Sequence, residues 1–365
     1  MSDYILLQQE LSLYSGKARS YLRYKNIPFV QQFASLNAYR KTILPKTGVA
    51  MIPVVVTPEG EALQDTTVII DWFEARFPDR PVYPETPLQK IAAMLLELYG
   101  DEWLLLPAMH YRWNFPKDND DFIYSEFGRV VWQNGPKFFR RAVGKKLGNQ
   151  FRGFVEPLGI SAATIPAIEQ WWQETLDVLS AHFDRYPYLL GHRASVGDFG
   201  FMGPLYAHLS RDPYPGKLMR ERAPQVQAWV ERMNQTHPQI GDWIDGDDVP
   251  QTLDSIFKRQ FAEQFPVLKD TAEHLPEWVA QNPGKILPRS IGKHDFTIGE
   301  AKGQRRRLTY SLWMWQRVLD AYASLGEPDK QSVDAWLARL GHAGVLEYRM
   351  PLRIGRKNNR CVIED

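Results

Sequence analysis

The chain has 365 residues and a mass of 42.2 kDa, which predicts two or three domains. Its 44% hydrophobic and 24% charged residues are ordinary globular proportions, and they exclude a disordered or fibrous protein. The 44 Lys and Arg residues nearly balance 43 Asp and Glu residues, giving a formal net charge of +1. A chain so close to neutral has no global field for gripping nucleic acid or an anionic membrane, so we expect neither as a partner, although local basic runs remain possible.

The single cysteine and the N-terminus define the expected compartment. Cys361 is the one cysteine, which excludes an internal disulfide, a CxxC redox pair and a thiolate zinc site. The first ten residues lack a basic start and a long apolar run, and no eighteen apolar residues follow one another. We therefore expect a cytoplasmic protein with no signal peptide and no membrane span.

The first 85 residues alternate between strand-like and helix-like patterns, in the order βαβ followed by ββα. Pro53 lies within an expected strand, and because proline cannot donate to a ladder, one explanation is a cis peptide at a tight bend. The expected strands are 4–8, 29–33, 51–57 and 62–63, and the expected helices lie between residues 12 and 25 and after a cap at 65–67.

The rest of the chain is first helical and then mixed. Residues 87–244 have helical spacing, except that 118–159 is polar, basic and glycine-rich, which predicts less regular helices or an elaborated loop. Residues 245–250 are acidic with a proline, which is typical of a linker. Beyond it we expect helices at 253–265, 312–325 and 331–340 and strands at 294–300, 304–309 and 345–354.

Four motifs occur in order in the first domain, and together they resemble the thioredoxin-like domain of glutathione transferases. They are SLYS at 12–15, NIPF at 26–29, MIPVV at 51–55 and QDTTVI at 64–69, similar to the SxxS, GIPY, VPVL and ESxAI elements of that family. In the helical part, YLLGHRASVGDF at 188–199 is similar to a motif of the transferase C-terminal domain. There Ser195 and Asp198 have the spacing of a capping box, so we expect Asp198 to be structural.

The resemblance covers roughly residues 4–240 and implies a fold class. We expect an α/β thioredoxin-like glutathione-binding domain at 1–86 and an all-α helical domain at 87–244. An additional α+β C-terminal extension at 251–365 has a role that the resemblance does not explain. The resemblance also implies a homodimer.

The resemblance implies glutathione as co-substrate and Ser12 as the catalytic residue. A hydroxyl at the N-terminus of a helix can donate a hydrogen bond to the glutathione thiolate, the nucleophilic form of the thiol, while the helix dipole favours the negative charge. The alternative for Ser12 is an ordinary N-cap. Ser15 takes the position of the resolving cysteine of redox relatives, so glutaredoxin-like and omega-type thiol chemistry is excluded. Tyr4 and Tyr14 are further hydroxyl donors to consider.

The peptide part of glutathione is expected to bind as an added strand. The resemblance implies that the backbone of Ile52, before the cis Pro53, pairs with the cysteinyl unit. It also places the γ-glutamyl group at the helix N-terminus formed by Asp65 and Thr66, where free N–H groups point; a plain N-cap is the alternative. Met51 stands where relatives often carry Lys or Gln, which puts glutathione affinity in doubt, and Lys41 and Lys46 are the candidate substitutes.

Aromatic residues of the second domain are candidates for a pocket that takes a small apolar electrophile. Periodicity alone does not separate a pocket from a packed core, and an aromatic stripe is more often core. The pocket candidates are Trp103, His110, Tyr111 and Trp113. His110 and the nearby acids at 101 and 102 fit no metal-ligand spacing, so we expect no metal site.

Two basic runs of the extension, 305–307 and 353–360, are expected to be solvated faces, with an anionic partner as the alternative.

Three functions remain open from the sequence. The first is a serine-type glutathione transferase that conjugates, or otherwise uses, the glutathione thiolate on a small apolar electrophile. The second is a non-catalytic binding or scaffolding module with the transferase fold. The third is a glutathione-dependent isomerase or lyase. The second substrate is not encoded in any motif that we recognise.

Overall fold

A computed structural model describes residues 3–236 and 240–364. The chain divides into two compact units, which we call unit 1 and unit 2. Unit 1 contains the stretches up to Val82, Pro107–Val155 and Phe201–Ile240; unit 2 contains Tyr83–Leu106, Glu156–Gly200 and Gly241 onward. Two of the boundaries fall within helices, one in α6 (Leu105–Trp113) and one in α10 (Val196–Pro204). The division into domains at 1–86, 87–244 and 251–365 stays a prediction.

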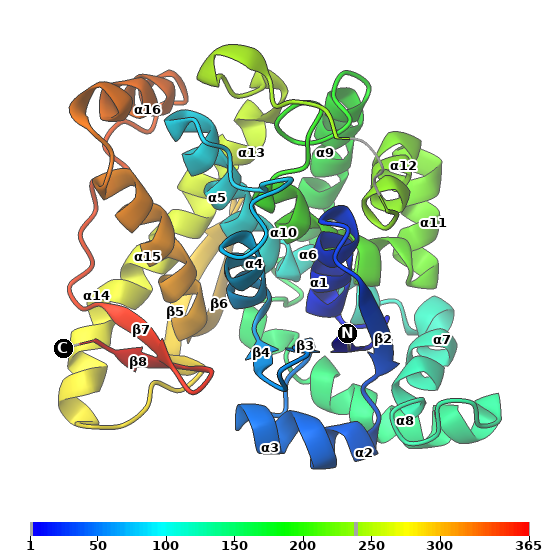
Figure 1. The fold of residues 1–365 in the computed structure, drawn as a ribbon. Coiled ribbons are helices and arrows are strands. Elements are labelled where there is room, and N and C mark those ends of the chain that lie inside the picture. The colour runs from blue at the N-terminus through cyan, green and yellow to red at the C-terminus, as the bar shows by residue number, and fades with distance from the viewer. Residues whose placement is uncertain (1–2, 237–239, 365) are drawn as a thin grey trace. The chain divides into compact units, whose positions relative to one another are not determined.

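Unit 1 contains a four-stranded mixed sheet of thioredoxin-like topology, with strand order β2-β1-β3-β4 (Figure 1). β1 is parallel to β2 and antiparallel to β3, and β3 is antiparallel to β4. The elements of this part are β1 (Tyr4–Gln8), α1 (Leu13–Tyr24), β2 (Phe29–Phe33), β3 (Val54–Val56), β4 (Ala62–Gln64) and α4 (Thr66–Glu74). The predicted fold class is therefore confirmed, with β1 and β2 at their expected bounds.

The third strand is shorter than predicted. Pairing begins at Val54, directly after Pro53, which has no N–H to give to the ladder. The Ile52–Pro53 peptide bond is cis, as the sequence suggested.

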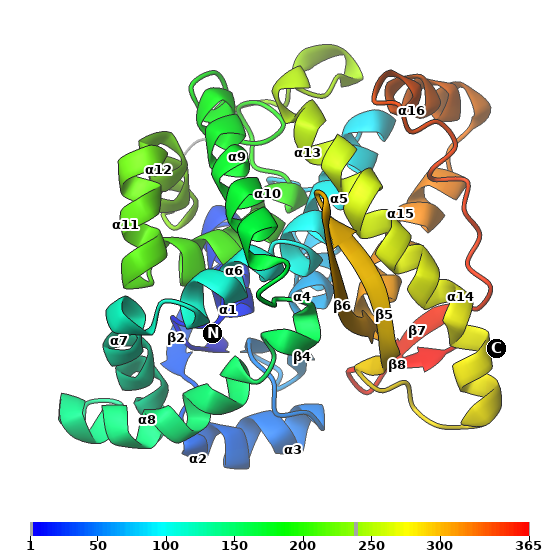
Figure 2. The same cartoon turned by 180° about the vertical axis from the view of Figure 1, so that it is seen from behind.

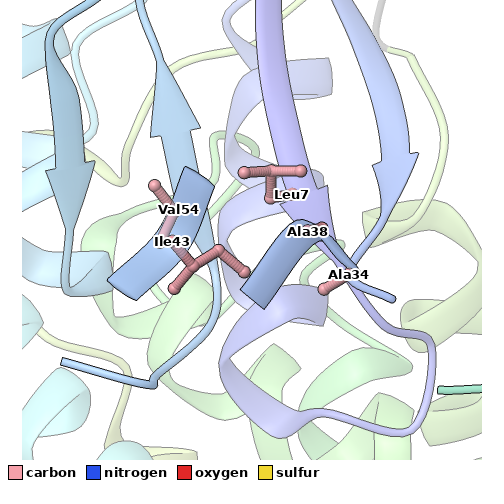
Figure 3. Packing of buried hydrophobic residues seen from close by; sticks show 5 residues of the cluster. All are labelled: Leu7, Ala34, Ala38, Ile43 and Val54. Carbon is pink, nitrogen blue, oxygen red and sulfur yellow. The ribbon is translucent and has the colours of Figure 1, made fainter. Parts of the chain in front are cut away.

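Successive side chains of a strand point to opposite faces of the sheet, and each face packs against different helices. On one face Leu7 and Val54 pack with Ala34, Ala38 and Ile43 (Figure 3). On the other face the ring of Tyr4 meets that of Phe73 in α4, with ring centroids 5.0 Å apart. Tyr4 is therefore engaged in the α4 packing.

A helical segment between β2 and β3 was not predicted. It comprises α2 (Leu36–Ala38), the π-helical turn η1 (Tyr39–Ile43) and α3 (Leu44–Thr47), and it begins at Ser35, whose Oγ accepts a hydrogen bond from Ala38 N. Leu36 and Leu44 are 40% and 49% exposed. Because these apolar side chains are exposed, the spacing of apolar residues in this segment does not mark a buried helix face.

The glycine-rich stretch expected to be irregular forms two regular helices, α7 (Pro116–Gly128) and α8 (Lys137–Arg152). The glycines serve close helix packing, since a Cβ on Gly144 would lie 1.8 Å from Tyr124 O and one on Gly128 would lie 1.9 Å from Arg140 O. The remaining helical elements of unit 1 are η3 (Leu205–Ser210), α11 (Pro213–Arg222) and α12 (Pro224–Met233).

Unit 2 is built around α5 (Pro87–Glu102), whose residues are buried on every side from Leu88 onward, apart from Lys90. A helix that is buried all round belongs in a core. Gln260 and Gln264 donate to the carbonyls of Leu95 and Leu98 over 2.8 and 3.2 Å. These two glutamines lie in the extension, so the extension forms part of the wall around α5.

The predicted linker also contacts α5. In the turn η4 (Asp245–Asp247), Asp247 accepts hydrogen bonds from the backbone N–H groups of Leu88 and Gln89 over 3.0 and 2.9 Å, capping the first turn of α5. This segment is therefore a structural contact rather than a free spacer.

The extension follows as helices and two hairpins. Figure 2 shows the β5–β6 hairpin beside α14. Besides α5, η4 and parts of α6 and α10, the helical elements of unit 2 are η2 (Glu156–Leu158), α9 (Ile165–Phe183), η5 (Gln251–Leu253), α13 (Asp254–Arg259), η6 (Gln260–Gln264), α14 (Phe265–Gln281), α15 (Thr309–Ala323) and α16 (Glu327–Arg339). Its strands are β5 (Ser290–Ile298), β6 (Ala301–Leu308), β7 (Ile354–Lys357) and β8 (Arg360–Ile363).

Two expectations for the extension were wrong. The strand predicted at 345–354 is absent, and β7 begins at Ile354, where a turn through Asn358 and Asn359 at positive φ leads into β8. The basic run on β6 is not a uniformly solvated face. Arg305 is 3% exposed, and its guanidinium carbon lies 4.8 Å from the ring centre of Trp103.

The helical-domain motif has the structural role assigned to it. The carboxylate of Asp198 accepts hydrogen bonds from the N–H groups of Ser195 and Leu189 over 2.8 and 3.0 Å. The hydroxyl of Ser195 donates to the same carboxylate over 3.0 Å. Asp198 is fully buried.

No helix among residues 3–236 and 240–364 combines the length and apolar character needed to span a bilayer.

Candidate functional site

The register of the sheet brings three predicted site segments to one end of unit 1. Leu7 in β1 lies opposite Val54 in β3, which lies opposite Gln64 in β4. The loop that leaves β1, the bend before β3 and the start of α4 therefore emerge at the same end, from strands about 4.8 Å apart.

Ser12 is the N-cap of α1 and is partly exposed at this end. Its Oγ accepts a hydrogen bond from Ser15 N over 3.3 Å. Among the described residues no acceptor takes the hydroxyl proton of Ser12, so that proton is available to donate to a ligand. Ser15 is fully buried and its Oγ lies 3.4 Å from Gln9 N, which points to a structural role.

The start of α4 is shaped by Asp65, whose φ of +85° and ψ of 130° are unusual for a residue with a side chain. Its carboxylate accepts hydrogen bonds from Thr67 N over 3.0 Å and from Val68 N over 3.4 Å. Lys17 of α1 reaches the hydroxyl of Thr67 over 3.4 Å and is fully buried. The buried Thr66 occupies the first helical position. A non-glycine residue at positive φ is an outlier of the kind that clusters at binding sites.

The bend before β3 presents an open backbone. Among the described residues neither the N–H nor the C=O of Ile52 has a hydrogen-bond partner, and both lie outside the sheet. Of the two lysines suggested as substitutes at Met51, Lys46 donates to Gly60 O over 2.7 Å, while Lys41 is exposed.

A buried ion pair holds the chain just before Ser12. Arg112 and Asp212 form a bidentate pair with distances of 2.6 and 2.9 Å, and both are almost fully buried. The same guanidinium donates to the carbonyls of Leu11 over 2.9 Å and Ala207 over 2.7 Å. Burial raises the pKa of Asp212, and Arg112 opposes that shift.

A second charged group lies within the β1–α1 loop itself. Glu10 pairs with the buried Arg19 over 2.8 Å and accepts a hydrogen bond from the hydroxyl of Tyr206 over 2.5 Å. Burial acts to raise the pKa of Glu10, but Arg19 and Tyr206 outweigh it and lower the pKa. Glu10 is therefore ionised at neutral pH and serves to fix the loop.

The predicted electrophile-pocket residues lie in packed surroundings. Tyr111 and Trp113 are 2% and 0% exposed, and their rings stack on Phe115 and Phe127 with centroids 5.5 and 5.9 Å apart. His110 Nδ1 lies 2.8 Å from Asn114 Nδ2, and the ring is 1% exposed. These three belong to unit 1. Trp103 belongs to unit 2 and is 1% exposed, so the pocket stays a prediction.

Sequence reasoning missed Lys17, Arg112 and Asp212. The hydrophobic pattern gives no signal for the partner of a buried charge. The position of Arg112, three residues after Met109 in an otherwise apolar helix, was the one available hint.

No group of three or more His, Cys, Asp or Glu side chains in the described part of the chain is arranged to hold a metal ion.

Two family models match the chain. Residues 6–81 match the glutathione S-transferase N-terminal domain, and residues 172–236 match the glutathione S-transferase C-terminal domain. These two segments, which together are less than half of the chain, support an assignment to the glutathione transferase superfamily. A comparison with curated protein sequences finds no match.

A comparison with solved structures matches, among others, three proteins. A glutathione S-transferase from Rhodospirillum rubrum F11 is 15% identical, with 68% of this chain and 96% of that chain covered and a TM-score of 0.41. One from Methylobacterium radiotolerans, complexed with glutathione sulfonate, is 18% identical, with 67% and 100% covered and a TM-score of 0.39. A beta-etherase from Sphingobium sp. strain SYK-6 is 17% identical, with 65% and 96% covered and a TM-score of 0.44. The family assignment rests on the two family models.

Proposed function

We propose that the protein is a serine-type glutathione transferase that uses the glutathione thiolate on a small apolar electrophile. The observation that carries the proposal is the hydroxyl of Ser12, which accepts from Ser15 N and keeps its own proton for a ligand at the N-terminus of α1. The proposed assembly is a cytoplasmic homodimer, on the grounds of resemblance.

The remaining contacts follow from the backbone groups at the same end of the sheet. The N–H and C=O of Ile52, beside Pro53, would pair with the cysteinyl unit of glutathione as an added strand. The α4 N-terminus at Asp65 and Thr66 would hold the γ-glutamyl group, with the Asp65 carboxylate near its ammonium.

The reaction needs little more from the protein. The thiol of bound glutathione loses its proton to solvent, and the thiolate is stabilised by the Ser12 hydroxyl and the α1 dipole. The sulfur then attacks the electrophilic carbon, forming a C–S bond, and the leaving group departs with its electron pair.

Substitution Ser12→Ala tests the role of the hydroxyl. Loss of one donor to a developing or resident anion lowers turnover about 100-fold. It also removes an N-cap, which costs about 1 kcal/mol of stability. The matched control is Ser35→Ala, since Ser35 caps α2 through an equivalent bond to Ala38 N but lies in another loop. We expect Ser35→Ala to keep full turnover with a model electrophile.

Glutathione binding is measured separately, as the rise in melting temperature of each variant with the ligand. Saturation at about 1,000 times Kd stabilises a binder by about 4 kcal/mol. Turnover that survives Ser12→Ala would refute the serine assignment. Absence of any glutathione-induced stabilisation in the unmodified protein would refute the whole proposal.

The second candidate, a non-catalytic binding module, is favoured by the Met51 position. Lys46, one of the two candidate cations for the glycyl carboxylate, is engaged by Gly60 O. This candidate predicts no thiol-dependent turnover and no glutathione-induced stabilisation. A glutathione-dependent isomerase or lyase would share the glutathione site, and only a product assay separates it from a transferase.

A further inference from the structure

The segment from Arg129 to Phe154 has a charge distribution unlike that of the whole chain. It contains seven basic residues and no acidic residue, although the protein carries a net charge of only +1. The basic residues are Arg129, Lys137, Arg140, Arg141, Lys145, Lys146 and Arg152. We call the exposed side chains of this segment the α8 surface.

The same surface exposes large apolar side chains. Phe138 is 77% exposed, which is the largest value among the exposed large hydrophobic residues of the described chain. The apolar members of the α8 surface are Val131, Trp132, Phe138, Phe139, Phe151 and Phe154. Apolar patches of this kind, rimmed by charge, mark interaction sites on proteins.

The packing of α8 explains why so much of it is exposed. Its buried residues are Gly144 and Gly148, which have no side chain and sit against Tyr124 of α7. The helix therefore packs on α7 through its glycine backbone, which leaves most of its side chains exposed, although the ring of Phe151 also lies 5.1 Å from that of Phe127, between centroids. Figure 1 shows α8 beside α7.

Side chains of α8 separate into two stripes. Phe139, Val143, Leu147 and Phe151 repeat every four residues and so follow one side of the helix. Ring contacts lengthen this stripe at both ends, since Trp132 lies 5.4 Å from Phe139, and Phe154 lies 6.4 Å from Phe151, between ring centroids.

The basic stripe repeats in the same way through Lys137, Arg141 and Lys145. Asp121 pairs with Lys137 over 2.6 Å and with Arg141 over 3.3 Å. The other basic residues of α8 lack an ion-pair partner in the described part of the chain; they are Arg140, Lys145, Lys146 and Arg152.

We propose that the α8 surface docks this protein on an anionic lipid bilayer, with its exposed apolar side chains in the headgroup layer and its Lys and Arg side chains on the phosphates. Interfacial helices combine Lys and Arg with Phe and Trp in this way, and their lysines extend past the apolar stripe to the charged headgroups. The proposal does not depend on glutathione chemistry.

Charge argues against a second copy of the chain as the occupant. A twofold interface places identical patches against each other, so the four basic residues of α8 that lack an ion-pair partner in the described part of the chain would face their own copies. Like charges across an interface disfavour association. A lipid surface supplies the missing negative charge and accommodates the protruding rings.

The experiment is co-sedimentation of the full chain with vesicles of phosphatidylcholine alone or with about one third phosphatidylserine. We expect binding to the anionic vesicles, little binding to the neutral ones, and loss of binding at high salt because screening weakens the attraction. Each basic residue near such a surface strengthens binding about fivefold, so Lys145→Gln with Lys146→Gln should weaken it about 25-fold.

A second variant tests the apolar contribution. Phe138→Ser should weaken binding about tenfold, since an exposed Phe stabilises the bound state by burial. The matched controls are Lys217→Gln with Arg220→Gln on α11, and Ile286→Ser, a 52% exposed apolar residue outside α8. Circular dichroism verifies that every variant is folded, and the controls should bind like the unmodified protein.

Three outcomes would overturn the proposal. The first is equal or absent binding to both vesicle types, and the second is binding that the α8 variants do not reduce. The third is capture by heparin or an acidic peptide, or loss of a dimer in Phe138→Ser by ultracentrifugation, without vesicle binding. That result would assign the surface to an acidic macromolecule or to a second copy.

Discussion

Removing Asp212 should be far more damaging than removing a surface acid with the same geometry. Asp212 and Arg112 are 0% and 3% exposed, and the carboxylate takes two of the guanidinium hydrogen bonds. In Asp212→Ala the buried cation keeps only the neutral carbonyls of Leu11 and Ala207. Breaking a buried pair in this way costs about 3–5 kcal/mol, a large part of the stability of a typical domain.

The matched control is Asp320→Ala. Asp320 binds Arg353 in the same bidentate manner, at 2.9 and 2.7 Å, but both side chains are about half exposed. Exposed pairs contribute about 0–1 kcal/mol. Urea unfolding gives the two losses, and hydrogen exchange of peptides from α6 and α11 locates the first one in unit 1.

The double variant Asp212→Leu with Arg112→Met completes the test. Replacing both charges by apolar groups removes the uncompensated cation, so most of the lost stability should return. Turnover should stay low, because Leu11, beside Ser12, has lost its anchor. Equal losses in Asp212→Ala and Asp320→Ala, or no recovery in the double variant, would refute the reasoning.

Two further predictions concern packing and pH. Gly144→Ala places a Cβ 1.8 Å from Tyr124 O, so it should lower the free energy of unfolding by about 1–3 kcal/mol and speed hydrogen exchange in α8. The control Gly326→Ala, whose Cβ would have its nearest atom 3.9 Å away, should change neither quantity. Slow exchange in α8 of the Gly144→Ala variant would contradict the close-packing account. Burial lowers the pKa of His182 from 6.5 to about 4, so the unfolded state takes up the proton first and stability should fall as pH drops from 6.5 towards 4, by up to about 1.4 kcal/mol per pH unit. His182→Gln should reduce the slope of the urea midpoint against pH. Some slope should remain, because burial also lowers the pKa of His294 to about 4. An unchanged slope would contradict the role of His182.

The sheet of unit 1 could be predicted because local signals agree there with the fold. Tyr4–Gln8 is a short apolar run, Phe29–Phe33 directly follows a proline that ends the preceding helix pattern, and Asp65 is a strong cap before an apolar helix. In α8 the local signals pointed elsewhere. Its glycines read as loop residues, since only the position of α7 shows that they are required for contact.

The candidate site was predictable only where a motif spans it. Ser12 and Asp65 lie at helix starts that the sequence marks, so their places could be assigned before the structure was seen. Arg112 and Asp212 are 100 residues apart, and nothing local to either shows that they meet. The aromatic residues around Tyr111 were found in the sequence, but their role could not be predicted, because an aromatic stripe has the same spacing whether it lines a cavity or fills a core.

Gln260 and Gln264 donate hydrogen bonds to α5, and Asp247 caps its first turn. Through these contacts the C-terminal part of the chain forms part of the core around α5. A helix that is buried on all sides has no polar face, so removal of the elements that cover it exposes its apolar side chains to water. Cleavage after α12, at the place where the family match ends, would therefore strip α5 and leave an aggregation-prone fragment rather than a minimal transferase. The C-terminal extension and α5 therefore have to be kept together in any shortened form of the protein.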